Sequence, residues 1–229
     1  MISRLSVAAS MVALSLSTGW IQRQQPGPDL LAGDPGRLVL ENVTATRVQY
    51  RGRNAIRVVA KPGTTGTPVE RIAIVPGVEF RDGVIEADIA GIPAAGADTS
   101  ARGFVGIAFR VDSSRTRYAA FYLRPTNGRA TDQLRRNHSS QYVVHPEFPW
   151  SRLRKEQPGV YESYVDLEPG AWTPIRIEVR SGIARLYVKG APQPTLIVSD
   201  MKNPPATGAV ALWIDSGTEA HFSRLRVSK

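Results

Sequence analysis

Apolar and polar side chains alternate with a period close to two along most of the chain from residue 37 onward. In the segment 84–89, the apolar Ile85 and Ile89 project from one face, while the acidic Glu86 and Asp88 project from the other. Alternation of this kind is typical of a β-strand that buries one of its faces. We therefore expect strands to build most of this protein.

Turn residues separate these alternating segments, which have the lengths of ordinary strands. Long runs rich in Ala, Glu, Lys and Leu, which would indicate a helical bundle, do not occur. Hydrophobic residues make up 42% of the chain, which is enough for a core without disulfides. The pattern predicts an all-β sandwich or barrel, with strands over 37–40, 54–60, 69–75, 84–89, 104–111, 117–124, 172–179, 183–188, 195–198, 208–215 and 220–227.

One long segment, 125–169, interrupts this rhythm. It contains several prolines and aromatic residues, and it is much longer than an ordinary hairpin loop. Long ordered loops often carry binding or catalytic residues, so this segment is a candidate for function.

The first 36 residues differ in composition from the rest of the chain. Arg4 precedes an uncharged, weakly apolar stretch at 5–16, and small residues follow at 17–19. This order is that of a secretory signal peptide, and the apolar stretch is too short to span a bilayer. We expect a signal peptide at 1–19, a Pro- and Gly-rich linker at 20–36 and one domain at 37–229, in a protein that is secreted or periplasmic.

Charge and cysteine content restrict the function classes. The formal net charge is +9, but the 24 arginines and five lysines are spread along the chain and form no dense basic run. We therefore expect no nucleic-acid partner, and no membrane contact beyond the export signal. The absence of cysteine excludes disulfides, thiolate nucleophiles and Cys-based zinc sites.

Two carboxylates are the first candidates for chemistry. Glu86 and Asp88 share one face of a predicted strand, about 7 Å apart, a spacing that allows an acid and a nucleophile for glycoside hydrolysis. The alternative is that both carboxylates pair with strand arginines such as Arg110 and Arg124.

Arginine and tyrosine side chains point to the same polar face in two later strands. Tyrosine rings stack on sugars, and the guanidinium fork binds carboxylates or vicinal hydroxyls. Beside the two acids they would form a sugar-binding groove, although a cross-strand ladder of ion pairs is the alternative. The residues predicted to bind substrate on these strands are Arg110, Tyr118, Tyr122 and Arg124.

The long segment adds amides, histidine and aromatic residues, which suit a polyhydroxylated ligand. His138 could act as an acid or base near neutral pH, although a structural histidine is the alternative. No metal-ligand spacing occurs, so we predict no metal site, and the sequence leaves open whether calcium binds. The further residues predicted to contact substrate are Asn127, Arg136, Asn137, Gln141, Tyr142 and Trp150.

Seven segments together carry a resemblance to a known superfamily: VIEADI (84–89), GFVGIAFR (103–110), YAAFYL (118–123), WTPIRIEV (172–179), ARLYV (184–188), GAVALW (208–213) and GTEAHFSRLRV (217–227). In this order they resemble the concanavalin A-like lectin/glucanase superfamily, and most nearly its laminin-G-like and 3-keto-disaccharide hydrolase-like branches. The resemblance covers about residues 37–228 and implies a jelly roll of two curved antiparallel sheets. It also implies carbohydrate binding or cleavage on the concave face, although a fold does not by itself establish function.

One departure from this superfamily weakens the enzymatic reading. The glucanase motif, Glu-x-Asp-x-x-Glu, needs a third acid on the strand that carries Glu86 and Asp88, but here the strand continues as Ile-Ala-Gly-Ile at 89–92. The resemblance therefore argues against retaining glucanase chemistry of that type.

Three hypotheses follow. The first is an exported, monomeric carbohydrate-binding domain, which could also hydrolyse a glycoside or 3-keto-glycoside. The second is a true glycoside hydrolase or lyase that pairs Glu86 or Asp88 with His138. The third is a structural or adhesive domain whose polar face is filled by the long segment.

Overall fold

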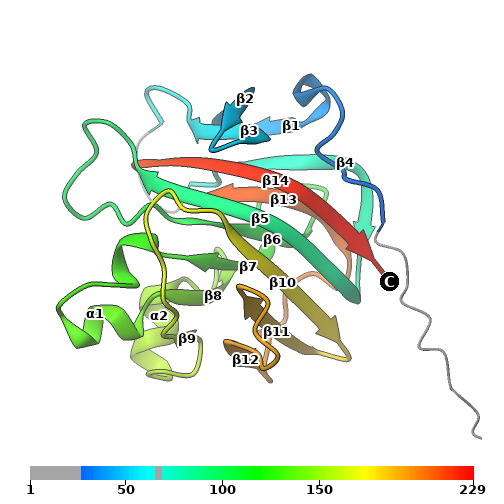
Figure 1. Cartoon of the computed structure of the whole chain (residues 1–229). Helices are drawn as coiled ribbons and strands as arrows, with labels where there is room; N and C mark the ends of the chain where they lie inside the picture. The colour runs from blue at the N-terminus through cyan, green and yellow to red at the C-terminus, as the bar shows by residue number, and fades with distance from the viewer. Residues whose placement is uncertain (1–26, 65–68) are drawn as a thin grey trace, which may run out of the picture.

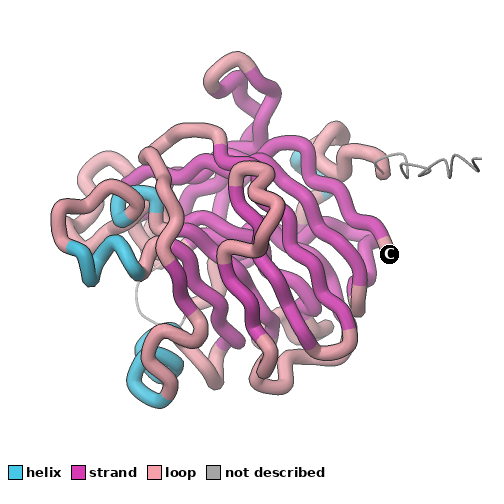
Figure 2. Tube along the Cα trace, turned by 60° about the horizontal axis from the view of Figure 1, so that its bottom comes forward, coloured by secondary structure: helices cyan, strands magenta, loops and turns pink. Residues whose placement is uncertain are grey.

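Two antiparallel β-sheets pack face to face in the part of the chain that the structure describes (Figure 1). The structure is a computed structural model and describes residues 27–64 and 69–229. The signal peptide expected at 1–19 and the start of the expected linker, 20–26, lie outside the described residues. The two curved sheets confirm the predicted jelly-roll sandwich (Figure 2).

Each sheet has seven strands, and sequence neighbours often lie apart in it. The first sheet runs in the order β1 (Val39–Glu41), β4 (Ile72–Phe80), β13 (Gly208–Ile214), β6 (Val105–Val111), β7 (Tyr118–Leu123), β8 (Ser140–His145) and β9 (Glu162–Ser163). The second runs in the order β12 (Leu196–Val198), β11 (Ile183–Val188), β10 (Thr173–Arg180), β5 (Gly83–Pro93), β14 (Thr218–Ser228), β3 (Arg53–Ala60) and β2 (Val43–Tyr50).

Aromatic side chains fill the space between the sheets. Phe109 meets Phe80 edge-to-face at 6.0 Å and lies 6.2 Å from Phe121. Tyr142 packs 5.1 Å from Phe121 in the same layer, and its hydroxyl donates to the carbonyl oxygen of Met201 at 2.8 Å. Tyr142 is therefore a core residue, and the prediction that it contacts substrate is wrong.

The observed strands differ from the predicted pattern in two ways. The sequence did not predict strands β2, β8 and β9, the last two because they lie inside the long interrupting segment. The strand predicted at 69–75 continues through Pro76 and Gly77 in β4, where a register shift opposite β13 absorbs the extra residues. A β-bulge lets a strand pass through such residues, so Pro and Gly do not end β4 here.

Residues 27–36, expected as linker, lie against the sandwich. The backbone amide of Leu30 donates to the carbonyl oxygen of Leu225 on β14, and Leu31 is 6% exposed. A short 3₁₀ helix, η1 (Pro35–Arg37), begins after Asp34, whose side chain caps it. The packed unit therefore begins ahead of residue 37.

The long segment 125–169 adds two strands to the edge of the first sheet and forms short helices next to them (Figure 1). It contains η2 (Pro125–Asn127), α1 (Gln133–Asn137) and α2 (Trp150–Glu156), together with β8 and β9. Asp132 caps α1 by accepting from the backbone amide of Arg135, and Leu153 anchors α2 in the core. No helix in the described ranges combines the length and apolar character that crossing a membrane would need.

A buried histidine makes the stability of this fold dependent on pH. His221 on β14 is 3% exposed, lies under the stacked ring of Tyr50 at 3.6 Å, and has no hydrogen-bond partner for Nδ1 in the described structure. Burial lowers its pKa from 6.5 to about 4, although Glu219 opposes this shift. The native state therefore resists protonation in a range where the unfolded chain accepts a proton.

We predict that the free energy of unfolding is unaffected by His221 above pH 6.5 and decreases as the pH falls from 6.5 to about 4. The decrease amounts to roughly 3 kcal/mol, since one unit of pKa corresponds to about 1.4 kcal/mol. His221→Phe should remove this part of the pH dependence, as measured by urea unfolding at pH 7, 5.5 and 4. Equal slopes for both proteins would contradict the assignment.

Candidate functional site

Two adjoining pockets lie beside β7 and β8 of the first sheet, next to α1 and α2. The larger, which we call the arginine pocket, has a volume of about 960 Å³. The smaller, the tyrosine pocket, has a volume of about 480 Å³. Trp150, at the start of α2, lines both pockets and is 43% exposed. The long segment therefore borders this face and leaves space on it.

Arg124 follows the last residue of β7 and lines the arginine pocket. Its side chain is buried at 4% exposure, and its guanidinium donates only to neutral oxygens in the described structure. Nη1 donates to the carbonyl oxygen of His138 at 2.9 Å, and Nη2 donates to the Tyr122 hydroxyl at 2.9 Å and to Gln141 Oε1 at 3.1 Å. The guanidinium of Arg124 is thus held by neutral acceptors, while the charges of Glu162 and Asp215 act on it without a hydrogen bond and that of Arg154 opposes them.

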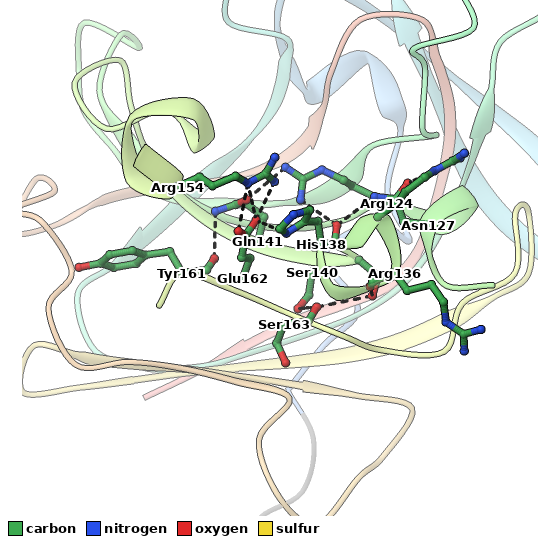
Figure 3. Close-up of polar contacts among 12 residues, drawn as sticks. Arg124, Asn127, Arg136, His138, Ser140, Gln141, Arg154, Tyr161, Glu162 and Ser163 are labelled. Atoms are coloured by element: carbon green, nitrogen blue, oxygen red, sulfur yellow. Dashed lines mark hydrogen bonds and ion pairs between the residues drawn. The ribbon is translucent and has the colours of Figure 1, made fainter. Parts of the chain in front are cut away.

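Gln141 on β8 supplies one acceptor for Arg124, and its side-chain amide is itself held in place by two hydrogen bonds. Its Nε2 donates to the carbonyl oxygens of Tyr142 and Tyr161, at 3.0 and 2.9 Å. These two bonds orient the amide so that Oε1 faces Arg124 (Figure 3). Gln141 therefore acts as a positioning residue behind the pocket.

Glu162, on the short strand β9, joins Arg154 and His138. Arg154 donates to both Glu162 oxygens, at 2.7 to 3.1 Å, and His138 Nδ1 lies 2.9 Å from Oε2. The angles at Nδ1 are not those of a hydrogen bond, so His138 lies close to Glu162 without donating to it. Desolvation lowers the pKa of His138, Glu162 opposes this, and Arg154 and Arg124 reinforce it. The imidazole is therefore neutral at pH 7.

The opposite wall comes from α1 and two loops. Asn127 Nδ2 donates to the carbonyl oxygen of His138 at 3.1 Å, and its Oδ1 accepts from Arg135 Nε at 2.9 Å. Arg135 also donates to Thr126, and Arg102 donates to the carbonyl oxygens of Thr99 and Ala101. Two more guanidinium groups therefore line the pocket without a carboxylate partner in the described chain.

Aromatic rings form the tyrosine pocket. Tyr122 stacks on Trp213 with ring centroids 4.6 Å apart, and Trp213 Nε1 donates to the Tyr118 hydroxyl at 3.2 Å. His145 stacks on Tyr118 at 4.9 Å. Burial raises the pKa of Tyr122 to about 12 and also raises that of Tyr118, so both remain neutral hydrogen-bonding phenols.

Several predicted site residues do come together here. The arginine pocket is lined by Arg124, Asn127, Asn137, His138 and Trp150, and the tyrosine pocket by Tyr118, Tyr122 and Trp150. Gln141 lies behind the pocket, whereas the Arg136 side chain points away from this cluster (Figure 3). Arg136 Nη2 donates to the Tyr164 hydroxyl at 3.1 Å.

The expected convergence of Glu86 and Asp88 with these residues is wrong. Both acids lie on β5, which belongs to the second sheet. Asp88 is buried and pairs with Arg53 at 2.6 Å and with Arg224 on the adjacent strand β14. Glu86 is exposed, opposite Arg176 on β10. Alternation placed the acids on one face of their strand correctly, but it could not say which sheet the strand joins.

Arg110 also lies outside both pockets. It has a φ of 55° and lies where β6 and β13 shift register, so a β-bulge breaks the alternation at this point. Its guanidinium instead donates to the carbonyl oxygen of Arg81 and to Asp82, at 2.9 and 3.1 Å. Arg110 therefore secures the turn between β4 and β5.

The sequence pattern missed several pocket residues, because no regular spacing links them. They come from separate loops and short elements and meet only through the chain's path. These residues are Arg102, Phe104, Arg135, Arg154, Glu162 and Trp213. Within the described ranges, no three His, Asp or Glu side chains lie close enough together to hold a metal ion.

The fold has counterparts among solved structures. The chain is similar to a protein of unknown function with a galectin-like fold from Bacillus subtilis, with a TM-score of 0.56 and 12% identity over 89% of this chain and 94% of that one. It is also similar to the carbohydrate-binding module CBM66 from Bacillus subtilis, with a TM-score of 0.53 and 12% identity over 82% of this chain and 97% of that one.

These likenesses confirm the concanavalin A-like jelly-roll fold expected from the sequence. At 12% identity they show the fold alone. No family model matches the chain, and no curated protein sequence does.

The Glu162 carboxylate provides a direct test of the pocket's electrostatics. We predict that Glu162→Gln lowers the pKa of His138 further, because burial and the charges of Arg154 and Arg124 then act unopposed. NMR titration of the imidazoles would measure this shift, and the chain has only three histidines to assign. In the matched control Glu70→Gln, beside His145, the pKa of His138 should not change. A His138 pKa that is unchanged or raised in Glu162→Gln would rule out this arrangement.

Proposed function

We propose that this protein is a carbohydrate-binding domain and that the sugar occupies the two adjoining pockets beside β7 and β8. The observation that carries the proposal is Trp150, an exposed indole at the junction of the pockets, surrounded by planar hydrogen-bonding side chains. Indole and phenol rings stack on the apolar faces of sugars, and guanidinium and amide groups bind the hydroxyls.

The size and composition of the site support this proposal. Pockets for small ligands are typically about 300–1,000 Å³, are largely apolar and carry a few converging polar groups. Both pockets fall in this range, and the tyrosine pocket continues the arginine pocket past Trp150. Together they have room for more than one sugar ring. The similar fold of a carbohydrate-binding module also supports the proposal.

A second candidate function rests on the contact between His138 and Glu162. A neutral imidazole beside a carboxylate, at the edge of a pocket, has the composition of a general base and its orienting partner. In this hypothesis His138 takes or gives a proton during glycoside cleavage. Glu86 and Asp88 take no part, since they lie on the other sheet.

Turnover separates the two candidates. If the protein cleaves its ligand, His138→Gln should abolish product release, measured by chromatography of the oligosaccharide, and should leave most of the affinity intact. If it is a binding domain, the native protein should release no product at any pH while it still binds.

We also propose that the chain is exported and acts as a monomer. Export rests on residues 1–19 alone, and detection of the processed protein outside the cytoplasm would test it.

We predict that Trp150→Ala weakens sugar binding about tenfold or more, as expected for the loss of a stacking ring. Because the indole is exposed, the variant should keep its thermal stability. A glycan array followed by calorimetry would measure the affinity. The matched control is Tyr187→Ala on β11 of the second sheet, where the ring stacks under Arg176 at 3.8 Å. Binding to no glycan, or an equal loss in both variants, would refute the proposed function.

A further inference from the structure

Three of the four arginines that line the arginine pocket have no carboxylate partner in the described structure, whereas the fourth, Arg154, pairs with Glu162. Among the described residues outside the pocket, some arginines meet a carboxylate, as Arg53 meets Asp88 and Arg129 meets Asp166, and others, such as Arg180 and Arg185, do not. Arg102, Arg124 and Arg135 form no such ion pair within the described residues. Each donates to carbonyl, hydroxyl or amide oxygens, and all three line the same pocket.

The charges of Arg135 and Arg124 both act on Arg102. Burial lowers the pKa of Arg102, the charges of Arg135 and Arg124 lower it further, and the carboxylate of Asp98 opposes this shift. Arg102 comes from the loop before β6, Arg124 from the end of β7 and Arg135 from α1. Three separate segments therefore bring like charges into one pocket, where they repel each other.

The carboxylates of the pocket do not balance these charges. Four arginines and two carboxylates line it, so the lining carries a net excess of two positive charges. Glu162 is occupied by Arg154 and His138, and Asp132 caps α1 through the backbone amide of Arg135. Neither is bonded to the guanidinium group of Arg102, Arg124 or Arg135.

A buried guanidinium with only neutral partners favours an anion beside it. Arg124 is 4% exposed, and aromatic rings surround it, with the centroids of Tyr122, Phe104 and Trp150 at 5.0 to 5.9 Å from its guanidinium carbon. Charge–charge attraction is strong in such a desolvated site, and arginine binds carboxylate and sulfate oxygens in a two-pronged geometry.

We propose, on the basis of the proposed function, that the ligand is an oligosaccharide with an anionic substituent, either a uronic carboxylate or a sulfate ester. The anionic group lies in the arginine pocket, between Arg102, Arg124 and Arg135. The neighbouring sugar lies in the tyrosine pocket, which is lined by Tyr118, Tyr122 and Trp213.

The tyrosine pocket distinguishes this ligand from a nucleic acid. Among the described residues neither Arg nor Lys lines it, and its lining includes the carboxylate of Asp215. A nucleic-acid strand would need cationic contacts for successive phosphates along its path. A sugar chain with a charge at one position and a neutral ring at the next matches the two pockets better.

Matched pairs of glycans provide the test. An oligogalacturonate and its methyl ester share every linkage and differ only in charge, and a sulfated glycan and its desulfated form make a second pair. Calorimetry at low salt should show at least one acidic member bound about tenfold or more tightly than its neutral partner. The pair that shows the preference identifies the anionic group as carboxylate or sulfate.

Variants assign this preference to the pocket. Arg102→Gln and Arg135→Gln should each reduce the acidic-over-neutral preference severalfold and change the affinity for the neutral glycan much less. The control is Arg176→Gln on the second sheet, which removes the same charge outside both pockets. Thermal unfolding would check that all three variants fold.

Three results would overturn the inference. The first is equal binding of acidic and neutral partners, or a preference for neutral glycans, which would leave the proposed sugar-binding function standing. The second is an equal loss of the acidic-over-neutral preference in Arg176→Gln, which would show that the preference comes from the net charge of the chain and not from the arginine pocket. The third is tighter binding to single-stranded DNA than to any glycan. Binding to no glycan at all would refute the proposed function as well.

Discussion

The arginine pocket depends on the burial of one positive charge, that of Arg124. Arg124 loses almost all its contact with water, and a desolvated guanidinium requires acceptors for its donors. The structure supplies these from β7, β8 and the turn before β8, through Tyr122, Gln141 and the backbone of His138. These bonds therefore add to the pairing of β7 with β8 and to the burial of Leu153 in holding the long segment against the sandwich.

The same contacts fix the position of the Arg124 side chain without giving it a carboxylate partner. Neutral acceptors orient Arg124 but leave its charge in place. The nearest buried carboxylate, Glu162, is occupied by Arg154 and His138. An arginine held in one position by neutral acceptors has little conformational freedom to lose when a ligand binds beside it, which is the basis of the proposed anion site.

The sandwich itself serves as a scaffold for this site. Its core is built from residues such as Phe109 and Phe121 that face the second sheet, whereas the pocket side chains come mainly from loops and short helices at one side. This division is typical of folds that support many functions, since loops change without disturbing the core. It also explains why a likeness at 12% identity is informative about the fold and silent about the ligand.

The sequence by itself determined most strands of this protein and which side chains share a face of each strand. A period of two along a strand reports which side chains share a face, so it correctly predicted most strands and grouped Tyr118 and Tyr122 toward one pocket. It also marked the long segment 125–169 as the place for function, since 45 residues without alternation exceed an ordinary loop.

Only the tertiary structure decided which faces meet. Alternation is a property of one strand, and it does not report the sheet that the strand joins, so Glu86 and Asp88 were assigned to the wrong side. It also fails at a bulge, as at Arg110, because one extra residue reverses the faces. Glu162 comes from β9, Arg154 from α2 and Arg102 from the loop before β6, and only the folded path of the chain, set by burial of the core, brings their charges together.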